Sequence, residues 1–177
     1  YIIYSENTIM ANRVVDLLHI LILEDTADDV ELMERELKRA GLKFKSKVVD
    51  QREDFQNALF SFRPDVILSD HSLPAFNSLE ALDIVRSFKG QTGLNPPFIL
   101  VTGAVSEEFA IQCIRAGADD YILKDRLKRL SPSILNTIEK SQLEIERRKY
   151  LDHVIANEAM MREAEGLAKF GSWQVDL

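Results

Sequence analysis

The chain has 177 residues, of which 46% are hydrophobic and 29% are charged, a balance typical of a folded globular protein. The formal net charge of -7 argues against binding to nucleic acid, which depends on clustered Lys and Arg side chains. The apolar runs near residues 17–23 and 98–101 are far shorter than the ~20 residues that cross a bilayer. We therefore expect no membrane span, and the single Cys113, which cannot close an internal disulfide, favours the reducing cytoplasm.

The sequence begins with an irregular segment and then alternates between two patterns. We interpret residues 1–17 as a leader or a disordered N-terminus. Short aliphatic runs predict five strands, at residues 20–23, 44–49, 66–68, 98–101 and 121–123. Apolar residues spaced three and four apart predict helices between them, at residues 28–40, 54–62, 79–88 and 107–116. This alternation predicts an α/β fold, a doubly wound five-stranded parallel sheet with helices on both faces.

Small and polar residues mark the expected helix ends. Gly41 and Gly117 lie where two of the helices should stop. Ser78 precedes the third predicted helix, and we expect it to be the N-cap of that helix.

The residues after Leu127 predict a long C-terminal helix. Residues 131–166 are rich in Glu, Arg, Lys, Leu, Ile and Met, and we interpret them as a linker helix. Their apolar positions begin in one heptad frame and continue in another, which predicts an imperfect coiled coil. Because only the first turns are needed to cover the sheet, we expect the rest to contact a partner, as a homodimer.

Polar side chains follow four of the five predicted strands. Glu24 and Asp25 come after the first strand and Asp70 after the third. Thr102 follows the fourth strand and Lys124 the fifth. Each alone could be a helix cap or a solvated charge. Ligands of open α/β sheets bind beyond the carboxyl ends of the strands, so we expect these five residues to converge.

Three carboxylates held together predict a bound cation. An all-oxygen donor set favours a hard ion, and Mg²⁺ also keeps waters that a phosphoryl oxygen can replace. A carboxylate can attack phosphorus when a metal ion and an ammonium neutralise the growing charge. We expect Asp70 to attack, Lys124 to help neutralise, and the Thr102 hydroxyl to bind a phosphoryl oxygen.

Four motifs resemble those of the receiver domain of two-component response regulators. They are residues 22–25 (ILED), 70–74 (DHSLP), 101–103 (VTG) and 117–124 (GADDYILK). The motifs occur in the family's order, and the resemblance covers roughly residues 18–141. It implies a flavodoxin-like fold and a receiver module in a phosphorelay, with residues 18–130 as the receiver domain. Such a module is not an enzyme but promotes its own phosphorylation by a histidine kinase or a phosphotransfer domain.

The resemblance also implies roles for individual residues. It implies four Mg²⁺ ligands, namely the side chains of Glu24, Asp25 and Asp70 and the backbone carbonyl of Ser72. It makes Asp70 the phosphoacceptor and places Thr102 and Lys124 against the phosphoryl group. Thr102 and Tyr121 match the switch pair, in which the aromatic ring moves inward after phosphorylation. An ordinary aromatic residue at a strand end is the alternative for Tyr121.

Two features depart from or extend this resemblance. Asp125 stands where the family usually has a proline, so the loop after the fifth strand is expected to differ. Residues 167–177 are similar to the opening of PAS sensory domains, in which a glycine and a tryptophan introduce the first strand. A receiver followed by a helix and a PAS domain would fit a hybrid histidine kinase as the full-length parent.

Three other functions compete for the same residues. A phosphatase of the haloacid dehalogenase type needs a second Asp two residues after its nucleophile, where this chain has Ser72. A flavodoxin needs a hydroxyl-rich phosphate loop after its first strand, where Glu24 and Asp25 would repel phosphate. A pseudo-receiver that only dimerises, without phosphorylation, is the remaining alternative.

Overall fold

The computed structural model describes residues 17–71, 73, 76–103 and 107–171. The predicted leader lies almost wholly outside these residues, as do Ser72 and residues 172–177. The strands are β1 (Leu18–Leu23), β2 (Phe44–Val49), β3 (Val66–Ser69), β4 (Phe98–Thr102) and β5 (Asp120–Leu123). The helices are α1 (Ala27–Arg39), α2 (Arg52–Phe62), α3 (Ser78–Thr92), α4 (Glu107–Ala116), η2 (Lys124–Arg129) and α5 (Leu130–Gly171).

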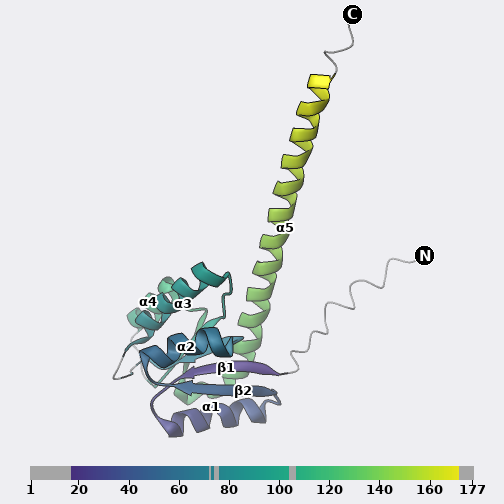
Figure 1. Cartoon of the computed structure of the whole chain (residues 1–177). Coiled ribbons are helices and arrows are strands. Elements are labelled where there is room, and N and C mark those ends of the chain that lie inside the picture. The colour runs from purple at the N-terminus through teal and green to yellow at the C-terminus, as the bar shows by residue number, and fades with distance from the viewer. Residues whose placement is uncertain (1–16, 72, 74–75, 104–106, 172–177) are drawn as a thin grey trace, which may run out of the picture. The chain divides into compact units, whose positions relative to one another are not determined.

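The strands form one parallel sheet in the order β2-β1-β3-β4-β5. Because β1 lies between β2 and β3, the chain reverses its direction of winding after β2, and the fold is doubly wound. Figure 1 shows β1 and β2 side by side, with α1 below them and α2, α3 and α4 on the opposite side of the sheet. The predicted flavodoxin-like fold with a long C-terminal helix is confirmed.

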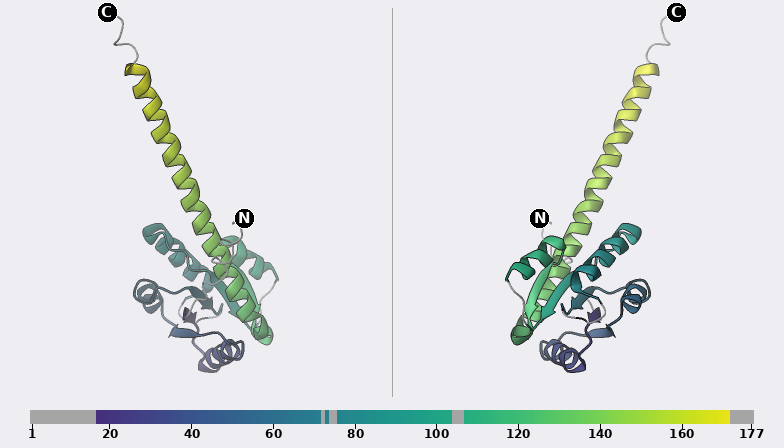
Figure 2. Two further views of the ribbon diagram at one scale, coloured as in Figure 1. Left: turned by 90° about the vertical axis from the view of Figure 1, so that its right-hand side faces the viewer. Right: turned by 90° about the vertical axis from the view of Figure 1, so that its left-hand side faces the viewer.

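Alternate residues of the strands belong to two separate hydrophobic clusters. Leu21 and Leu23 of β1 pack with side chains of α2, α3 and α4, including the buried Cys113. Ile20 and Ile22 pack on the other face, against α1 and the first turns of α5. Side chains of a strand point alternately to opposite faces, so strands that are apolar at every position require helices on both faces. Figure 2 shows these two helical layers from the sides.

The helix ends agree with the sequence pattern at the glycines and differ at Ser78. Gly41 and Gly117 follow α1 and α4 with φ values of 79° and 114°, in the left-handed region that glycine adopts without strain. The prediction of Ser78 as an N-cap is wrong, because Ser78 is already the first residue of α3. Asn77 is the N-cap, and its side chain accepts hydrogen bonds from the backbone amides of Leu79 and Glu80.

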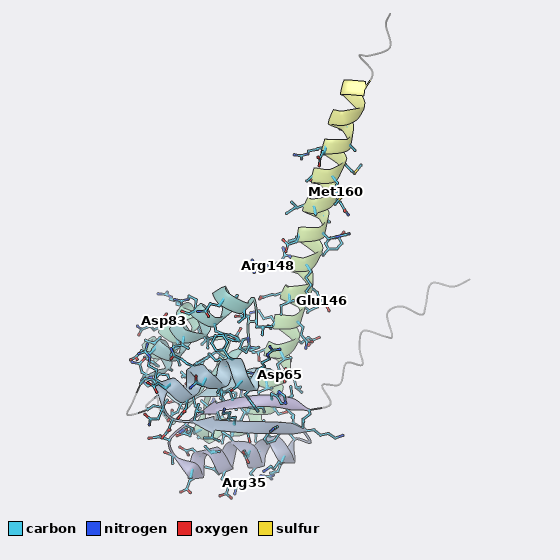
Figure 3. All side chains as sticks on the ribbon, viewed as in Figure 1. Arg35, Asp65, Asp83, Glu146, Arg148 and Met160 are labelled. Atoms are coloured by element: carbon cyan, nitrogen blue, oxygen red, sulfur yellow. The ribbon has the colours of Figure 1, made fainter. Side chains whose placement is uncertain are left out.

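Helix α5 has two parts with different surroundings. Its first turns belong to the hydrophobic core beside the sheet, where Leu130, Ile134 and Ile138 are buried. The compact unit that contains the sheet ends at Ile138, and Glu139–Leu177 form a second unit. In that second unit charged and apolar side chains are exposed, among them Glu146 and Met160 (Figure 3). None of the described helices is long and apolar enough to cross a membrane.

Candidate functional site

The strand register brings the predicted site residues to one edge of the sheet. Leu23 of β1 is paired with Ser69 of β3, so Glu24 and Asp70 leave neighbouring strands at the same level. The Asp70 amide donates a 2.9 Å hydrogen bond to the Leu23 carbonyl, which extends the ladder by one residue. On the other side, Thr102 of β4 is paired with Leu123, the residue before Lys124. The four strand ends therefore share one rim, as expected for a parallel sheet.

The Lys124 ammonium lies among three carboxylates. Its Nζ donates hydrogen bonds to Glu24 Oε2 at 2.7 Å, to Asp29 Oδ2 at 2.5 Å and to Asp70 Oδ2 at 3.1 Å. An ammonium has three N–H bonds, and each carboxylate can take one of them. The Lys124 side chain is only 16% exposed, so the charges attract each other with less screening than at an open surface.

The second oxygens of Glu24 and Asp70 are held by backbone amides. The Thr26 amide donates to Glu24 Oε1 at 3.0 Å, and the His71 amide donates to Asp70 Oδ1 at 2.6 Å. Both amides belong to residues that follow shortly after the carboxylate in the chain. Each carboxylate is thus fixed from two sides, by the Lys124 ammonium and by its own loop.

Three carboxylates form a group that could hold a metal ion. Glu24, Asp25 and Asp70 each offer one oxygen, and these oxygens lie within 4.8 Å of one another. Glu24 is 2% exposed and Asp70 is 9% exposed, whereas Asp25 is open to water. A donor set of carboxylate oxygens with access to solvent fits Mg²⁺, which usually binds one or two carboxylates and keeps several waters.

Burial and pairing act in opposite directions on the charges of the site. Burial raises the pKa of Glu24 above its ordinary value of 4.5, although hydrogen bonds from Lys124 and the Thr26 amide oppose the rise. Burial lowers the pKa of Lys124, but hydrogen bonds to Asp29, Glu24 and Asp70 outweigh it and raise the net pKa. Lys124 is therefore held as a cation, while the negative charge on Glu24 is poorly solvated and would be relieved by a bound cation.

The remaining predicted residues are placed as follows. Thr102 is 2% exposed at the end of β4, whereas Tyr121 of β5 is 41% exposed. Ser72, the predicted carbonyl ligand, lies outside the described residues. Asp125 is exposed in η2, the 3₁₀ segment that begins at Lys124.

Sequence reasoning missed Asp29 as a member of the site. An Asp in the first turn of a helix is favourable at almost any helix N-terminus, so this pattern does not distinguish Asp29 from Asp28. A signal was available in the spacing of α1, whose buried residues are Met33 and Leu37. Asp29 precedes Met33 by four positions and therefore lies on the same, inward side of the helix.

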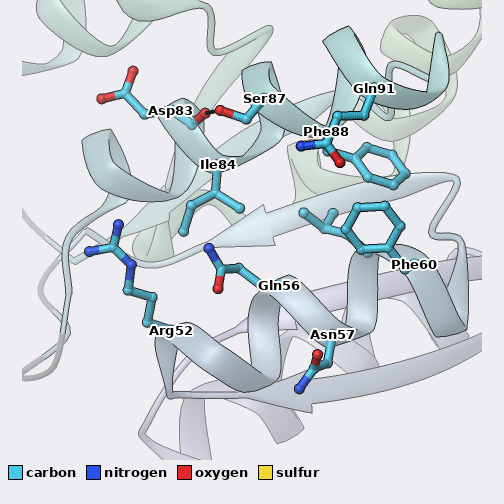
Figure 4. Close-up of a pocket in the computed structure, with 10 residues that line it drawn as sticks. Arg52, Gln56, Asn57, Phe60, Asp83, Ile84, Ser87, Phe88 and Gln91 are labelled. Carbon is cyan, nitrogen blue, oxygen red and sulfur yellow. Dashed lines mark hydrogen bonds between the residues drawn. The ribbon is translucent and has the colours of Figure 1, made fainter.

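A groove elsewhere on the molecule does not coincide with these residues. It has a volume of about 340 Å³ and lies between α2 and α3, with Arg52, Gln56, Phe60 and Phe88 in its walls (Figure 4). Phe60 and Phe88 make an edge-to-face contact there, with ring centroids 4.9 Å apart. None of the predicted site residues lines this groove.

Comparison with known proteins matches the part of the chain that contains the rim. The family model of the response regulator receiver domain matches residues 20–134, which include Glu24, Asp70 and Lys124. The DNA-binding response regulator MtrA of Mycobacterium leprae is 29% identical over 105 residues, which are 59% of this chain and 44% of that protein. A transcription factor of Saccharomyces cerevisiae is also 29% identical, over 60% of this chain and 16% of its own length. The chain thus spans less than half the length of these curated relatives.

Two solved structures have the same fold. The signal receiver domain of a modulated diguanylate cyclase from Desulfovibrio desulfuricans is 27% identical, with a TM-score of 0.60 over 73% of this chain and 99% of that chain. The receiver domain of a sensor histidine kinase from Pseudomonas aeruginosa is 23% identical, with a TM-score of 0.57 over 69% of this chain and 98% of that chain. The latter crystal structure contains a magnesium ion in the active site cleft.

Proposed function

This chain belongs to the response regulator receiver domain family, and we propose that it accepts a phosphoryl group on Asp70 during two-component signalling. The donor is a histidine kinase or a phosphotransfer domain. The observation that carries the proposal is the Lys124 ammonium 3.1 Å from Asp70 Oδ2, beside a group of three carboxylates. The chain acts as a signalling module, because its own aspartate rather than a released product carries the phosphoryl group.

In the proposed reaction, a carboxylate oxygen of Asp70 attacks the phosphorus atom of the donor. A new O–P bond forms as the bond between phosphorus and the donor breaks, and the leaving group keeps the electron pair. Lys124 neutralises negative charge on the transferring group, and its raised pKa keeps it protonated for this role. Thr102, buried at the end of β4, would donate its hydroxyl to a phosphoryl oxygen.

Glu24, Asp25 and Asp70, with the backbone carbonyl of Ser72, are proposed to hold Mg²⁺. The oxygen-only donors and the water-exposed Asp25 suit this ion, and a Mg²⁺ bound there would stabilise charge on the phosphoryl oxygens. The magnesium in the cleft of the Pseudomonas aeruginosa receiver domain supports the assignment by analogy.

The proposed signal passes from the phosphoryl group to the surface. Thr102 would turn its hydroxyl toward the phosphoryl group, and Tyr121, which is 41% exposed, would move inward into the space vacated. Register pairing places these two residues on adjacent strands, since Thr102 is paired with Leu123 and Tyr121 with Leu100.

Helix α5 is the proposed output element. We propose that residues 18–130 form the receiver, that residues 131–166 form a linker helix through which two copies pair, and that residues 167–177 begin a PAS domain. Exposed apolar side chains beyond the receiver core support the pairing, among them Leu143, Tyr150, Ile155 and Met161. Burying such side chains between two helices would remove apolar area from water.

Incubation with acetyl phosphate and Mg²⁺ tests the central proposal. Intact mass spectrometry should detect one phosphoryl adduct on the wild-type chain and none on Asp70→Asn. Asp83→Asn is a suitable control, because Asp83 is an exposed residue of α3 away from the rim. An adduct that persists in Asp70→Asn would show that another residue accepts the phosphoryl group and would overturn the role of Asp70. A wild-type chain that forms no adduct would favour the alternative of a non-phosphorylated dimerisation scaffold.

A further inference from the structure

Asp29 is the carboxylate at the rim that has no assigned role. Its Oδ2 makes the shortest of the three contacts to Lys124 Nζ, at 2.5 Å. Glu24 and Asp70 also contact this ammonium, but both belong to the group that could bind a metal ion, whereas Asp29 does not. Asp29 therefore holds Lys124 by a contact that needs neither the nucleophile nor the cation.

The packing of α1 fixes the position of Asp29. Met33 and Leu37, one and two turns further along the same side of the helix, are 1% and 0% exposed. They anchor α1 against the sheet in the same cluster as Leu127, which lies three residues after Lys124. Lys124 and Asp29 are thus carried by two elements that share one core.

A lysine needs this kind of support more than most residues. Its four-carbon stem has several rotatable bonds, and confining the ammonium to one place lowers its conformational entropy. Asp29 has a short side chain on a packed helix, so little freedom is lost when it holds the ammonium. The side chains of Asp29 and Lys124 are 27% and 16% exposed, so water screens the pair only in part.

We propose that Asp29 is a positioning residue for phosphoryl transfer, which keeps the Lys124 ammonium beside Asp70 before and after the reaction. This inference rests on the proposed function. When an Asp70 oxygen bonds to phosphorus, the carboxylate loses its negative charge, and Lys124 transfers that hydrogen bond to a phosphoryl oxygen. Glu24 would divide its attraction between Lys124 and the proposed Mg²⁺. Asp29 contacts Lys124 without belonging to the metal group, so its hydrogen bond to the ammonium can persist throughout the reaction.

Asp29→Asn and Asp28→Asn form a matched pair of variants for the test. Both remove one negative charge from the first turn of α1, but Asp28 is exposed and is not among the three carboxylates that contact Lys124 in the described part of the chain. With acetyl phosphate at saturating Mg²⁺, Asp29→Asn should lower the rate of Asp70 phosphorylation about tenfold, since a charge-assisted hydrogen bond becomes a neutral one. Asp28→Asn should stay within about twofold of the wild type, and Asp29→Glu should recover part of the rate.

A second measurement observes Lys124 directly. Nuclear magnetic resonance of the ¹⁵N-labelled Lys124 ammonium is recorded without Mg²⁺ or phosphoryl donor. It should show faster hydrogen exchange with water in Asp29→Asn than in the wild type or in Asp28→Asn. Unchanged exchange would overturn the proposal, and so would a phosphorylation rate that is equal or higher in Asp29→Asn. A lower melting temperature with an unchanged rate would reduce Asp29 to a structural role.

The two measurements separate this inference from the function on which it rests. If the wild-type chain forms no Asp70 adduct, the proposed function fails, and the role of Asp29 in transfer fails with it. The exchange measurement still decides whether Asp29 holds Lys124. If the adduct forms normally and only the Asp29 effects are missing, the proposed function stands and the positioning role alone is overturned.

Discussion

Ser133 Oγ donates a 2.5 Å hydrogen bond to Asp120 Oδ2, and this contact fastens the first turns of α5 to β5. The other oxygen of Asp120 accepts a hydrogen bond from the Tyr121 amide. Ser133 is only 7% exposed and lies beside the buried Ile134. The start of α5 is therefore held by a polar contact to an edge strand as well as by the apolar cluster beneath it.

Ser133→Ala should lower the free energy of unfolding by about 1–3 kcal/mol, because it leaves a carboxylate oxygen of Asp120 without its donor. Urea denaturation followed by circular dichroism would measure the change. Ser87→Ala is the control, since the Ser87 hydroxyl is exposed and bonds only within α3, and we expect a change within about 0.5 kcal/mol. Equal effects of the two substitutions would contradict the prediction.

The free energy of unfolding should depend on pH through Glu34, a residue of α1 whose side chain contacts Ser46 of β2. Ser46 Oγ donates to Glu34 Oε1 at 2.6 Å, and this bond lowers the pKa of Glu34 below its ordinary value of 4.5. A carboxyl with a lowered pKa in the folded state contributes stability above the unfolded value, and that contribution is lost as the pH falls through the folded value.

The difference in unfolding free energy between wild type and Glu34→Gln should therefore be largest near neutral pH and should shrink below about pH 4.5. Denaturant unfolding of both chains at several pH values provides the measurement. Glu31→Gln, at an exposed position of the same helix, serves as the comparison. A difference that stays constant from neutral to acidic pH would show that Glu34 makes no such contribution.

Mg²⁺ should raise the melting temperature of the chain through the group formed by Glu24, Asp25 and Asp70. A ligand that binds only the folded state stabilises it by about 2.7 kcal/mol at a concentration one hundred times its Kd. Asp25→Asn should remove most of this shift, and because Asp25 is exposed the substitution should disturb the fold little. Thermal unfolding with and without magnesium chloride is the measurement, with Asp28→Asn as control. The same shift in Asp25→Asn and wild type would place the ion elsewhere.

The chain should form dimers whose population rises with concentration. Leu143 and Tyr150 are 59% and 69% exposed and are seven residues apart, so they lie in one heptad frame of α5. Replacing both with Glu should shift the chain to monomers in analytical ultracentrifugation, because charges would enter the apolar seam. Arg148→Glu, between them in the chain, is the control. A monomeric wild-type chain at high concentration would refute the proposed pairing.

Much of the fold could be predicted because the three central strands, β1, β3 and β4, are buried on both faces. Five of the six residues of β1 are hydrophobic, His19 being the exception, and such strands indicate a parallel sheet between two helical layers. The exact ends of helices and strands were harder to predict, because they depend on individual hydrogen bonds of the backbone. Helix α3 was expected to end at Phe88 but continues to Thr92, and Asn77 rather than Ser78 accepts the hydrogen bonds at its start.

Residues of the candidate site could be predicted from the sequence where a polar side chain directly follows the end of a strand. Glu24, Asp70 and Lys124 meet because parallel strands deliver their carboxyl ends to one edge. Asp29 comes from a helix rather than a strand end, and only the packing of α1 shows that it faces Lys124 while Asp28 does not.

The burial of α5 ends at Ile138, while the helix itself continues to Gly171. A position where a helix leaves the core but continues as a helix is a natural point for recombination. An unrelated effector could be grafted in helical phase at any turn beyond Ile138 without removing a side chain from the receiver core. The same receiver could in this way be reused with different outputs, each joined by an exchange of the exposed part of one helix.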